Sequence, residues 1–243
     1  QLWLVVGGSR GFGGSLWQSL HSVATNHVVV YSRSEIEVPD TGRAEHHKLD
    51  IGDLENLPAL FTQSLEKHSG TNWEKVTLIN CAAVLGPISN VRDMDDYNAV
   101  RKAVDINFTS RFIINGIFLR TFADRKMTLV DISSGAHKSG GETWGVYCST
   151  KAAGVVLHQS IGKEQENCRV LNYSPGIMRT EMQETIAKGV DSPSKQFLAK
   201  VLDQNKEVPI AESVAKLLEV LEQDTFETGS YVDIYDSRGP PLQ

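Results

Sequence analysis

The sequence is poor in cysteine, lacks a long apolar run and contains no cluster of positive charge. Its three cysteines, Cys81, Cys148 and Cys168, are odd in number and lack metal-ligand spacing. They argue against a disulfide framework and suit a reducing compartment. No segment approaches the roughly 20 apolar residues of a membrane span. With a net charge of −6 and no basic cluster, we expect a cytoplasmic protein with neither a nucleic-acid nor a membrane partner.

The composition that is present suits one α/β domain better than two. The chain has 243 residues, of which 40% are hydrophobic and 22% charged, enough to bury a substantial core. No signal peptide or lipidation motif is visible. Because an apolar strand pattern begins at once and no initiator Met precedes it, we expect a few residues before Gln1 to be missing.

Short apolar runs alternate with segments of helical periodicity along the whole chain. The runs predict strands over residues 2–6, 27–32, 47–51, 76–79, 127–132, 169–173 and 231–235. Helical patterns follow the first strand and recur over 54–65, twice within 92–124, and over 146–166 and 211–221. This alternation predicts a parallel, doubly wound sheet with helices on both faces. We expect the polar, irregular residues 177–208 to form a flap over the site within the same domain.

A glycine-rich turn follows the first predicted strand. Glycines at such a strand-to-helix turn allow a tight bend and close backbone approach, and the helix N-terminus attracts a pyrophosphate. Alone, such a turn is a weak signal, but its flanks are the right ones. The predicted cofactor contacts here are Gly7, Ser9, Arg10, Gly11, Phe12 and Gly13.

The end of the second predicted strand favours NADP(H) as the cofactor. Arg33 lies 20 residues beyond Gly13, where NAD enzymes place an acid on the ribose 2′-hydroxyl and NADP enzymes accommodate a cation. Arg10 is a possible second cation for the 2′-phosphate. Glu35 is close enough to leave NAD as an alternative, and an arginine at a strand end is often only solvated surface.

Polar and small residues end the third and fourth predicted strands. Asp50 is either a hydrogen-bond acceptor near the adenine amine or, with Asp53, a helix cap. Asn80, Ala82 and Ala83 follow the fourth strand, where small residues let a ligand lie against the backbone.

Tyr147 and Lys151, with Ser134 thirteen residues before the tyrosine, form a candidate catalytic set. Residues four apart share a helix face. A free phenol has a pKa of about 10, and a nearby cation lowers it toward the range useful in acid–base catalysis. A serine hydroxyl at the same point could hold a carbonyl oxygen. Because Tyr-x-x-x-Lys alone is common on ordinary helix faces, the rest of the chain must decide.

Asn107 lies in the second helical pattern within 92–124, among apolar residues. An unsatisfied buried amide is costly, so Asn107 is either a satisfied core group or a functional one.

Jointly, these motifs have the order and spacing of one family: Gly7-x-x-x-Gly11-x-Gly13, Asn80-Cys81-Ala82-Ala83, Asn107, Ser134, Tyr147-x-x-x-Lys151 and Pro175-Gly176. On them the chain resembles the short-chain dehydrogenase/reductases over nearly its whole length. The resemblance implies a Rossmann-type sheet of about seven parallel strands. It also implies Tyr147 as acid/base, Ser134 orienting the carbonyl, and Lys151 holding the nicotinamide ribose and lowering the tyrosine pKa. Asn107 would position a relay water. Further implied cofactor contacts are Ser34, Ile51, Pro175, Gly176, Met178, Thr180 and Met182.

Within the family the likeness is to the sepiapterin reductases, through phrases at 9–13, 144–151, 169–176, 180–183 and 229–236. In the phrase at 229–236 the sepiapterin reductases carry an Asp that anchors the pterin, and the corresponding residue of this chain is Asp233. A carboxylate can accept from the pterin amine and ring N–H together, although Asp233 could also simply end a strand. The other implied substrate contacts are Ser134, Gly135, Trp144, Tyr147 and Gly176.

The resemblance implies an NADPH-dependent reductase of pterin side-chain ketones, taking 6-pyruvoyl-tetrahydropterin or sepiapterin toward tetrahydrobiopterin. It also implies a homodimer formed through the helices carrying Asn107 and Tyr147. The alternatives are a reductase of diketones such as benzil and, in another class, a non-catalytic NADP-binding regulator. The chain departs from the family at Val6, Ala83 and Asp131, in place of the usual Thr, Gly and Asn.

Overall fold

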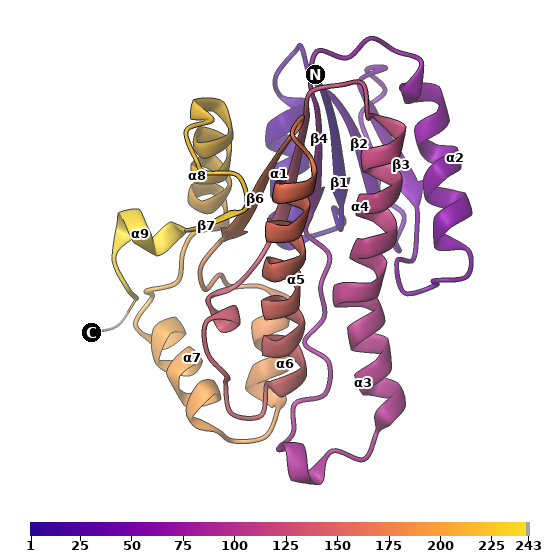
Figure 1. Cartoon of the computed structure of the whole chain (residues 1–243). Helices are drawn as coiled ribbons and strands as arrows, with labels where there is room; N and C mark the ends of the chain where they lie inside the picture. Colours follow the sequence, from indigo (N-terminus) through magenta and orange to yellow (C-terminus); the bar gives the residue numbers. More distant parts are fainter. Residues whose placement is uncertain (242–243) are drawn as a thin grey trace.

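A computed structural model describes residues 1–241 of the chain, which form a single α/β domain around one sheet (Figure 1). Seven parallel strands are arranged in the order β3-β2-β1-β4-β5-β6-β7. The strands are β1 (Leu2–Val6), β2 (His27–Ser32), β3 (Ala44–Lys48), β4 (Val76–Asn80), β5 (Met127–Ile132), β6 (Cys168–Ser174) and β7 (Ser230–Asp233). The predicted parallel, doubly wound sheet is confirmed.

Helices connect most of the strands and cover both faces of the sheet, whereas β2 leads to β3 without a helix. They are α1 (Gly11–His21), α2 (Leu57–Ser69), α3 (Tyr97–Val104), α4 (Ser110–Thr121), α5 (Gly145–Glu164), α6 (Glu181–Lys188), α7 (Pro193–Asp203), α8 (Ile210–Gln223) and α9 (Ile234–Arg238). Short turns of other helical types are η1 (Val91–Asp93), η2 (Asp105–Thr109, π-helical) and η3 (Gly135–His137). Within residues 1–241, no helix combines the length and apolar character needed to cross a bilayer.

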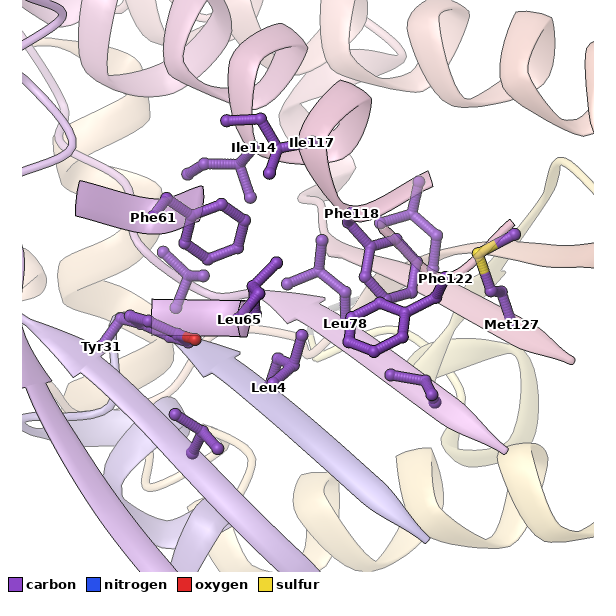
Figure 2. Packing of buried hydrophobic residues seen from close by; sticks show 14 of the residues in the cluster. Leu4, Tyr31, Phe61, Leu65, Leu78, Ile114, Ile117, Phe118, Phe122 and Met127 are labelled. Atoms are coloured by element: carbon purple, nitrogen blue, oxygen red, sulfur yellow. The ribbon is translucent and has the colours of Figure 1, made fainter. Parts of the chain in front are cut away.

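Side chains of each buried strand alternate between two hydrophobic cores, because successive strand residues point to opposite faces. In β1, Leu2 and Leu4 join the core beneath α2, α4 and α5, whereas Trp3 and Val5 join the core beneath α1 and α8. Figure 2 shows Phe61 and Phe118 reaching from the helices toward Leu4 in the first core. The central strands are therefore apolar on both faces, which is why they were visible in the sequence.

Two predicted strands have wrong boundaries, and one segment that was predicted to be irregular contains helices. The third strand runs over Ala44–Lys48 rather than 47–51, because the Asp50 side chain accepts from Gly52 N at 2.9 Å and turns the chain. The last strand ends at Asp233, whose carboxylate caps α9. Residues 177–208 are not irregular, since they contain α6 and α7.

The carboxyl ends of the strands meet at one edge of the sheet. Val6 is paired with Asn80, Asn80 with Asp131, and Asp131 with Asn172. The loops that follow these residues are thereby brought side by side, and they carry most of the predicted site residues.

Candidate active site

The glycine turn after β1 has the shape needed to hold a dinucleotide pyrophosphate. Gly7 and Gly11 have φ angles of +93° and +57°, which favour glycine. A Cβ on Gly7 would lie 2.5 Å from Ala82 N, and one on Gly13 would lie 2.2 Å from Gly7 O. No side chain within residues 1–241 caps the N-terminus of α1, so its N–H groups are available to an anion. The turn therefore fits the predicted cofactor. Ser9 is exposed beside the turn, and Phe12 is buried beneath it.

The two arginines predicted to meet a 2′-phosphate are both exposed near this turn. Arg10 forms an ion pair with Glu181 at the start of α6. Arg33 and Ser34 follow β2 and are exposed. The alternative ribose partner, Glu35, lies 3.9 Å from Lys48 Nζ.

The residues at the ends of β3 and β4 differ in their burial and in their hydrogen bonds. Asp50 is exposed and bonded to Gly52, and Ile51 beside it is buried. Asn80 donates to Asn115 Oδ1 at 2.9 Å, so its amide is bonded to a side chain of α4. The half-buried Ala82 and Ala83 carry the loop against the glycine turn.

Tyr147 and Lys151 lie one turn apart near the start of α5, and both are buried. Lys151 Nζ donates to Ile132 O at 2.6 Å and lies 5.7 Å from the centre of the Tyr147 ring. Ser134 follows β5 at the same edge and accepts from Ala136 N at 3.2 Å. Beside it, Gly135 is exposed. The structure thus brings the three predicted catalytic side chains to one end of α5.

Burial dominates the electrostatics of this set. It raises the pKa of Tyr147 to about 12, while the Ser134 side chain and Arg111 oppose the rise. Burial also lowers the pKa of Lys151 to about 8, with Arg111 acting in the same direction and Asp131 opposing. The direction for Tyr147 is opposite to the one expected from the Tyr147–Lys151 spacing, because desolvation of a phenolate outweighs a cation at this distance. Tyr147 therefore keeps its proton at neutral pH.

Asn107 occupies the π-helical turn between α3 and α4 rather than the second helix itself. Its Oδ1 accepts from Val84 N at 2.9 Å, and its Nδ2 donates to Val84 O at 2.7 Å and to Thr150 Oγ1 at 3.1 Å. The amide therefore joins the loop after β4 to α5 and is satisfied by the protein. Its relay-water role stays a prediction.

Sequence reasoning missed a buried ion pair behind the site. Arg111 Nε donates to Asp131 Oδ1 at 2.6 Å, Nη1 donates to Asn107 O at 2.7 Å, and Nη2 donates to Ala82 O at 3.3 Å. The pair explains the Asp that departs from the family pattern at 131. The signal was an Arg in an apolar helix and an Asp in an apolar strand, each of which requires a partner when buried.

The flap, residues 177–208, packs on Tyr147. Ile186 of α6 and Leu198 of α7 share a hydrophobic cluster with Tyr147, and Figure 1 shows both helices beyond the carboxyl ends of the strands. Thr143 donates to Ser192 at the start of α7 at 3.4 Å.

Several predicted contacts lie in or beside this flap. Trp144 Nε1 is buried and forms no hydrogen bond within residues 1–241, so it is a donor available to a bound molecule. The methyl of Thr180 lies 3.8 Å from the Cβ position of Gly11, against the glycine turn. The remaining flap-side contacts are the buried Pro175 and Met178 and the half-buried Gly176 and Met182.

Asp233 lies at the carboxyl end of β7, beside Ser174 of β6. Its Oδ1 accepts from Tyr235 N at 3.1 Å, and its Oδ2 accepts from the Tyr231 hydroxyl at 2.7 Å. The residue therefore caps α9, and it does so at the edge that carries the catalytic set. Tyr231 in turn lies 4.2 Å from the His137 ring, just after Ser134.

Comparison with known proteins identifies the family of this chain. The family model for short chain dehydrogenases matches residues 1–191. Sepiapterin reductase from Mus musculus is 30% identical, over 96% of each chain, and that from Xenopus tropicalis is 28% identical, over 97% of this chain and 96% of its own. Benzil reductase ((S)-benzoin forming) from Bacillus subtilis (strain 168) is 29% identical, over 76% of this chain and 78% of its own.

Solved structures share the fold. The KRED1-Pglu enzyme matches with a TM-score of 0.85 at 21% identity, covering 96% of this chain and all of its own. A 4-hydroxyisoleucine dehydrogenase complexed with NADH matches with a TM-score of 0.78 at 22% identity, covering 96% of each chain. At these identities the likeness concerns the fold alone.

Proposed function

The chain belongs to the short chain dehydrogenase family of oxidoreductases, and we propose that it is an NADPH-dependent carbonyl reductase that reduces the side-chain ketone of a pterin. The observation that carries the proposal is the set of buried Tyr147 and Lys151 and half-buried Ser134 at the carboxyl edge of the sheet, next to a glycine turn shaped for a pyrophosphate. Such an arrangement places a proton donor where a cofactor and a carbonyl would meet.

The chain's own residues supply positioning and one proton. When bound, the nicotinamide supplies a hydride, with its electron pair, to the carbonyl carbon. The Ser134 hydroxyl holds the carbonyl oxygen, and Tyr147 donates the phenol proton to that oxygen as it becomes a hydroxyl. Because burial raises the pKa of Tyr147 to about 12, the phenol is protonated at neutral pH, which suits reduction rather than oxidation.

The preference for NADPH rests on Arg10 and Arg33, both exposed near the glycine turn. A 2′-phosphate would compete with Glu181 for Arg10, and guanidinium groups suit phosphate. In Arg33→Ala, kcat/KM with NADPH should fall about tenfold while that with NADH changes little. Arg101→Ala, which removes an exposed arginine of α3, is the matched control. An equal loss with both cofactors would contradict the NADPH preference.

The pterin assignment rests on Asp233. A carboxylate offers about four acceptor positions. The Tyr231 hydroxyl and the backbone at the start of α9 use most of those of Asp233, so acceptor capacity remains for one pterin N–H. The similarity to sepiapterin reductases at 28–30% identity supports this substrate class.

A second candidate is a diketone reductase, which the 29% identity to a benzil reductase favours. NADPH oxidation with sepiapterin and with benzil, measured in parallel for the wild type and Asp233→Asn, separates the two. Because Asn also caps helices, this variant retains α9 while removing the charge. We expect sepiapterin turnover to fall about 10–100-fold and benzil turnover to change less than about twofold.

Each other result has a defined meaning. Turnover of benzil without turnover of sepiapterin would contradict the pterin substrate. The proposed catalytic roles of Tyr147, Lys151 and Ser134 would be unaffected. If neither compound is reduced although NADPH binds, the chain is better described as an NADP-binding regulator.

The proposal extends to a cytoplasmic homodimer formed through α4 and α5. Both helices expose a large apolar side chain, Phe112 at 54% and Val156 at 60%, and these would belong to the contact between the two copies. The three cysteines are free thiols, as a reducing compartment would leave them. Light scattering should give the mass of a dimer for the wild type and of a monomer for Phe112→Asp. Val23→Asp, at an exposed apolar residue remote from both helices, is the control.

A further inference from the structure

A cluster of imidazole and carboxylate groups lies at the opposite end of the sheet from Tyr147. His27 begins β2, Glu45 and His47 lie in β3, and His68 lies in the last turn of α2. His27 is paired with Leu2 at the amino end of β1, and Figure 1 shows the N-terminus at the opposite end of the sheet from α6 and α7. Side chains from three elements thus converge at a place that the proposed reaction does not use.

The spacing of the polar atoms in this cluster is that of a metal-ligand set. The ligand atoms of His27, Glu45 and His68 all lie within 4.8 Å of one another. His27 Nε2 is 2.9 Å from Glu45 Oε1, and His68 Nε2 is 3.5 Å from Glu45 Oε2. Ligands of a tetrahedral Zn²⁺ stand about 3.4 Å apart, given bond lengths near 2.1 Å. Side-chain shifts of about 1 Å would complete the site.

The cluster also contains buried polar atoms without hydrogen-bond partners. His68 is only 4% exposed, yet its Nε2 forms no hydrogen bond within residues 1–241. His47 Nε2 also forms no hydrogen bond within these residues, and it lies 3.6 Å from Glu45 Oε2. Buried polar groups are normally satisfied, so two unbonded imidazole nitrogens beside one carboxylate oxygen indicate a place for a further ligand.

Aromatic packing holds the two imidazole ligands in place. Trp73 lies 5.5 Å from the His27 ring and 6.3 Å from the His68 ring, centre to centre, and its Nε1 donates to His68 O at 3.1 Å. The rings are therefore oriented before any ligand arrives, which lowers the cost of binding.

Lys67 is the present cationic neighbour of the cluster. Its ammonium contacts Glu45 Oε2, but the side chain is 54% exposed and can swing into solvent. Lys67 and His47 also line a groove of about 380 Å³ between β3 and α2. A divalent cation bonded to two imidazoles would displace this single ammonium.

We propose that His27, Glu45 and His68 bind a divalent transition-metal ion, Zn²⁺ by preference, and so fasten the edge strand β3 to α2. The donor set decides the class of ion. Imidazole nitrogens suit Zn²⁺ and its neighbours, whereas Ca²⁺ and Mg²⁺ prefer oxygen ligands alone. His47 is the nearest group for a fourth position, which water can otherwise fill.

The test is a titration of the untagged, full-length protein with Co²⁺, followed by its visible absorption bands, and then displacement of Co²⁺ by Zn²⁺. The wild type should bind one equivalent with bands of a tetrahedral ion. Glu45→Gln and His68→Gln should weaken binding at least about tenfold. His46→Gln is the matched control, because His46 bonds to Ser32 Oγ instead of joining the cluster.

A variant that is expected to bind the metal ion more tightly is a useful second test, because misfolding would not increase the affinity for the ion. Lys67→Met removes the competing ammonium without removing a ligand, so its affinity should rise about tenfold. In the wild type, Zn²⁺ at about 100 times Kd should raise Tm by roughly 5–10 °C, and this shift should vanish in His68→Gln. Binding that is equal in the wild type, His68→Gln and Glu45→Gln would overturn the proposal, as would the absence of bands at 100-fold excess of Co²⁺.

Discussion

The two ends of the sheet hold charged groups in contrasting ways. At the carboxyl end, Arg111 donates to Asp131 and to two backbone carbonyls, and both side chains are almost fully buried. At the amino end, burial raises the pKa of Glu45, but contacts with Lys67 and His27 lower it to about 2, and unbonded atoms remain around it.

The Arg111–Asp131 pair holds its surroundings rigidly, whereas the cluster around Glu45 can rearrange to accept a ligand. A planar guanidinium with fixed donors locks the loops after β4 and β5 into one geometry, as a reactive centre requires. A flexible ammonium and unbonded imidazoles leave the other cluster adaptable. Substitutions at both ends of the sheet test this contrast.

Tyr147→Phe removes the proton donor while keeping the ring that packs beneath the flap. We expect kcat for carbonyl reduction to fall about 10²–10⁴-fold, with NADPH binding unchanged by fluorescence titration. Tyr97→Phe, at an exposed tyrosine, is the control and should be neutral. Turnover retained in Tyr147→Phe would show that another group donates the proton.

Asp131→Asn leaves the Arg111 guanidinium buried without a counter-charge. The expected cost is about 3–5 kcal/mol of unfolding free energy, measured by urea denaturation. The double variant Arg111→Met, Asp131→Leu should lose much less, because neither charge is then buried alone. A cost below about 1 kcal/mol for Asp131→Asn would mean that the pair is not what holds this end together.

The pH dependence of reduction should report Lys151. Its pKa is lowered to about 8 by burial, beside Arg111, Asp131 and Cys81, so the ammonium loses its proton as pH rises through about 8. We expect kcat/KM to fall about tenfold per unit above that pH. Lys151→Arg keeps the charge and should remove this limb. A limb near pH 8 that persists in Lys151→Arg would assign it to another group.

Lys67→Met in metal-free protein should have the smallest effect. Lys67 is half-exposed, and exposed ion pairs contribute about 0–1 kcal/mol. Thermal unfolding in the presence of a chelator should therefore show a Tm within about 3 °C of the wild type. A larger loss would mean that Lys67 and Glu45 form a structural pair like the one at the carboxyl end.

Strands buried on both faces could be predicted from sequence, and the edge strand could not. β1 and β4 are continuous apolar runs, whereas β3 is Ala-Glu-His-His-Lys and is only half-buried. The end of β7 was missed for a different reason, since Asp233 uses its carboxylate to begin α9 rather than continue the strand. The flap helices were hidden by their polar exposed faces.

The meeting of Tyr147, Lys151 and Ser134 could be predicted from sequence, although not from their spacing alone. Periodicity puts the first two on one helix face and a strand end supplies the third, and the other motifs of the chain made this set more than an ordinary helix face. The sequence also determined the parallel sheet and the glycine turn, because tight bends and buried strands leave patterns within a few residues.

Only the tertiary structure decided the pKa values, the Arg111–Asp131 pair and the cluster of His27, Glu45 and His68. Each depends on side chains that are distant in sequence and on how much water is excluded around them. Desolvation reversed the expected pKa shift of Tyr147, since the charge of an ion is favoured or disfavoured by its whole surroundings rather than by one neighbour four residues away.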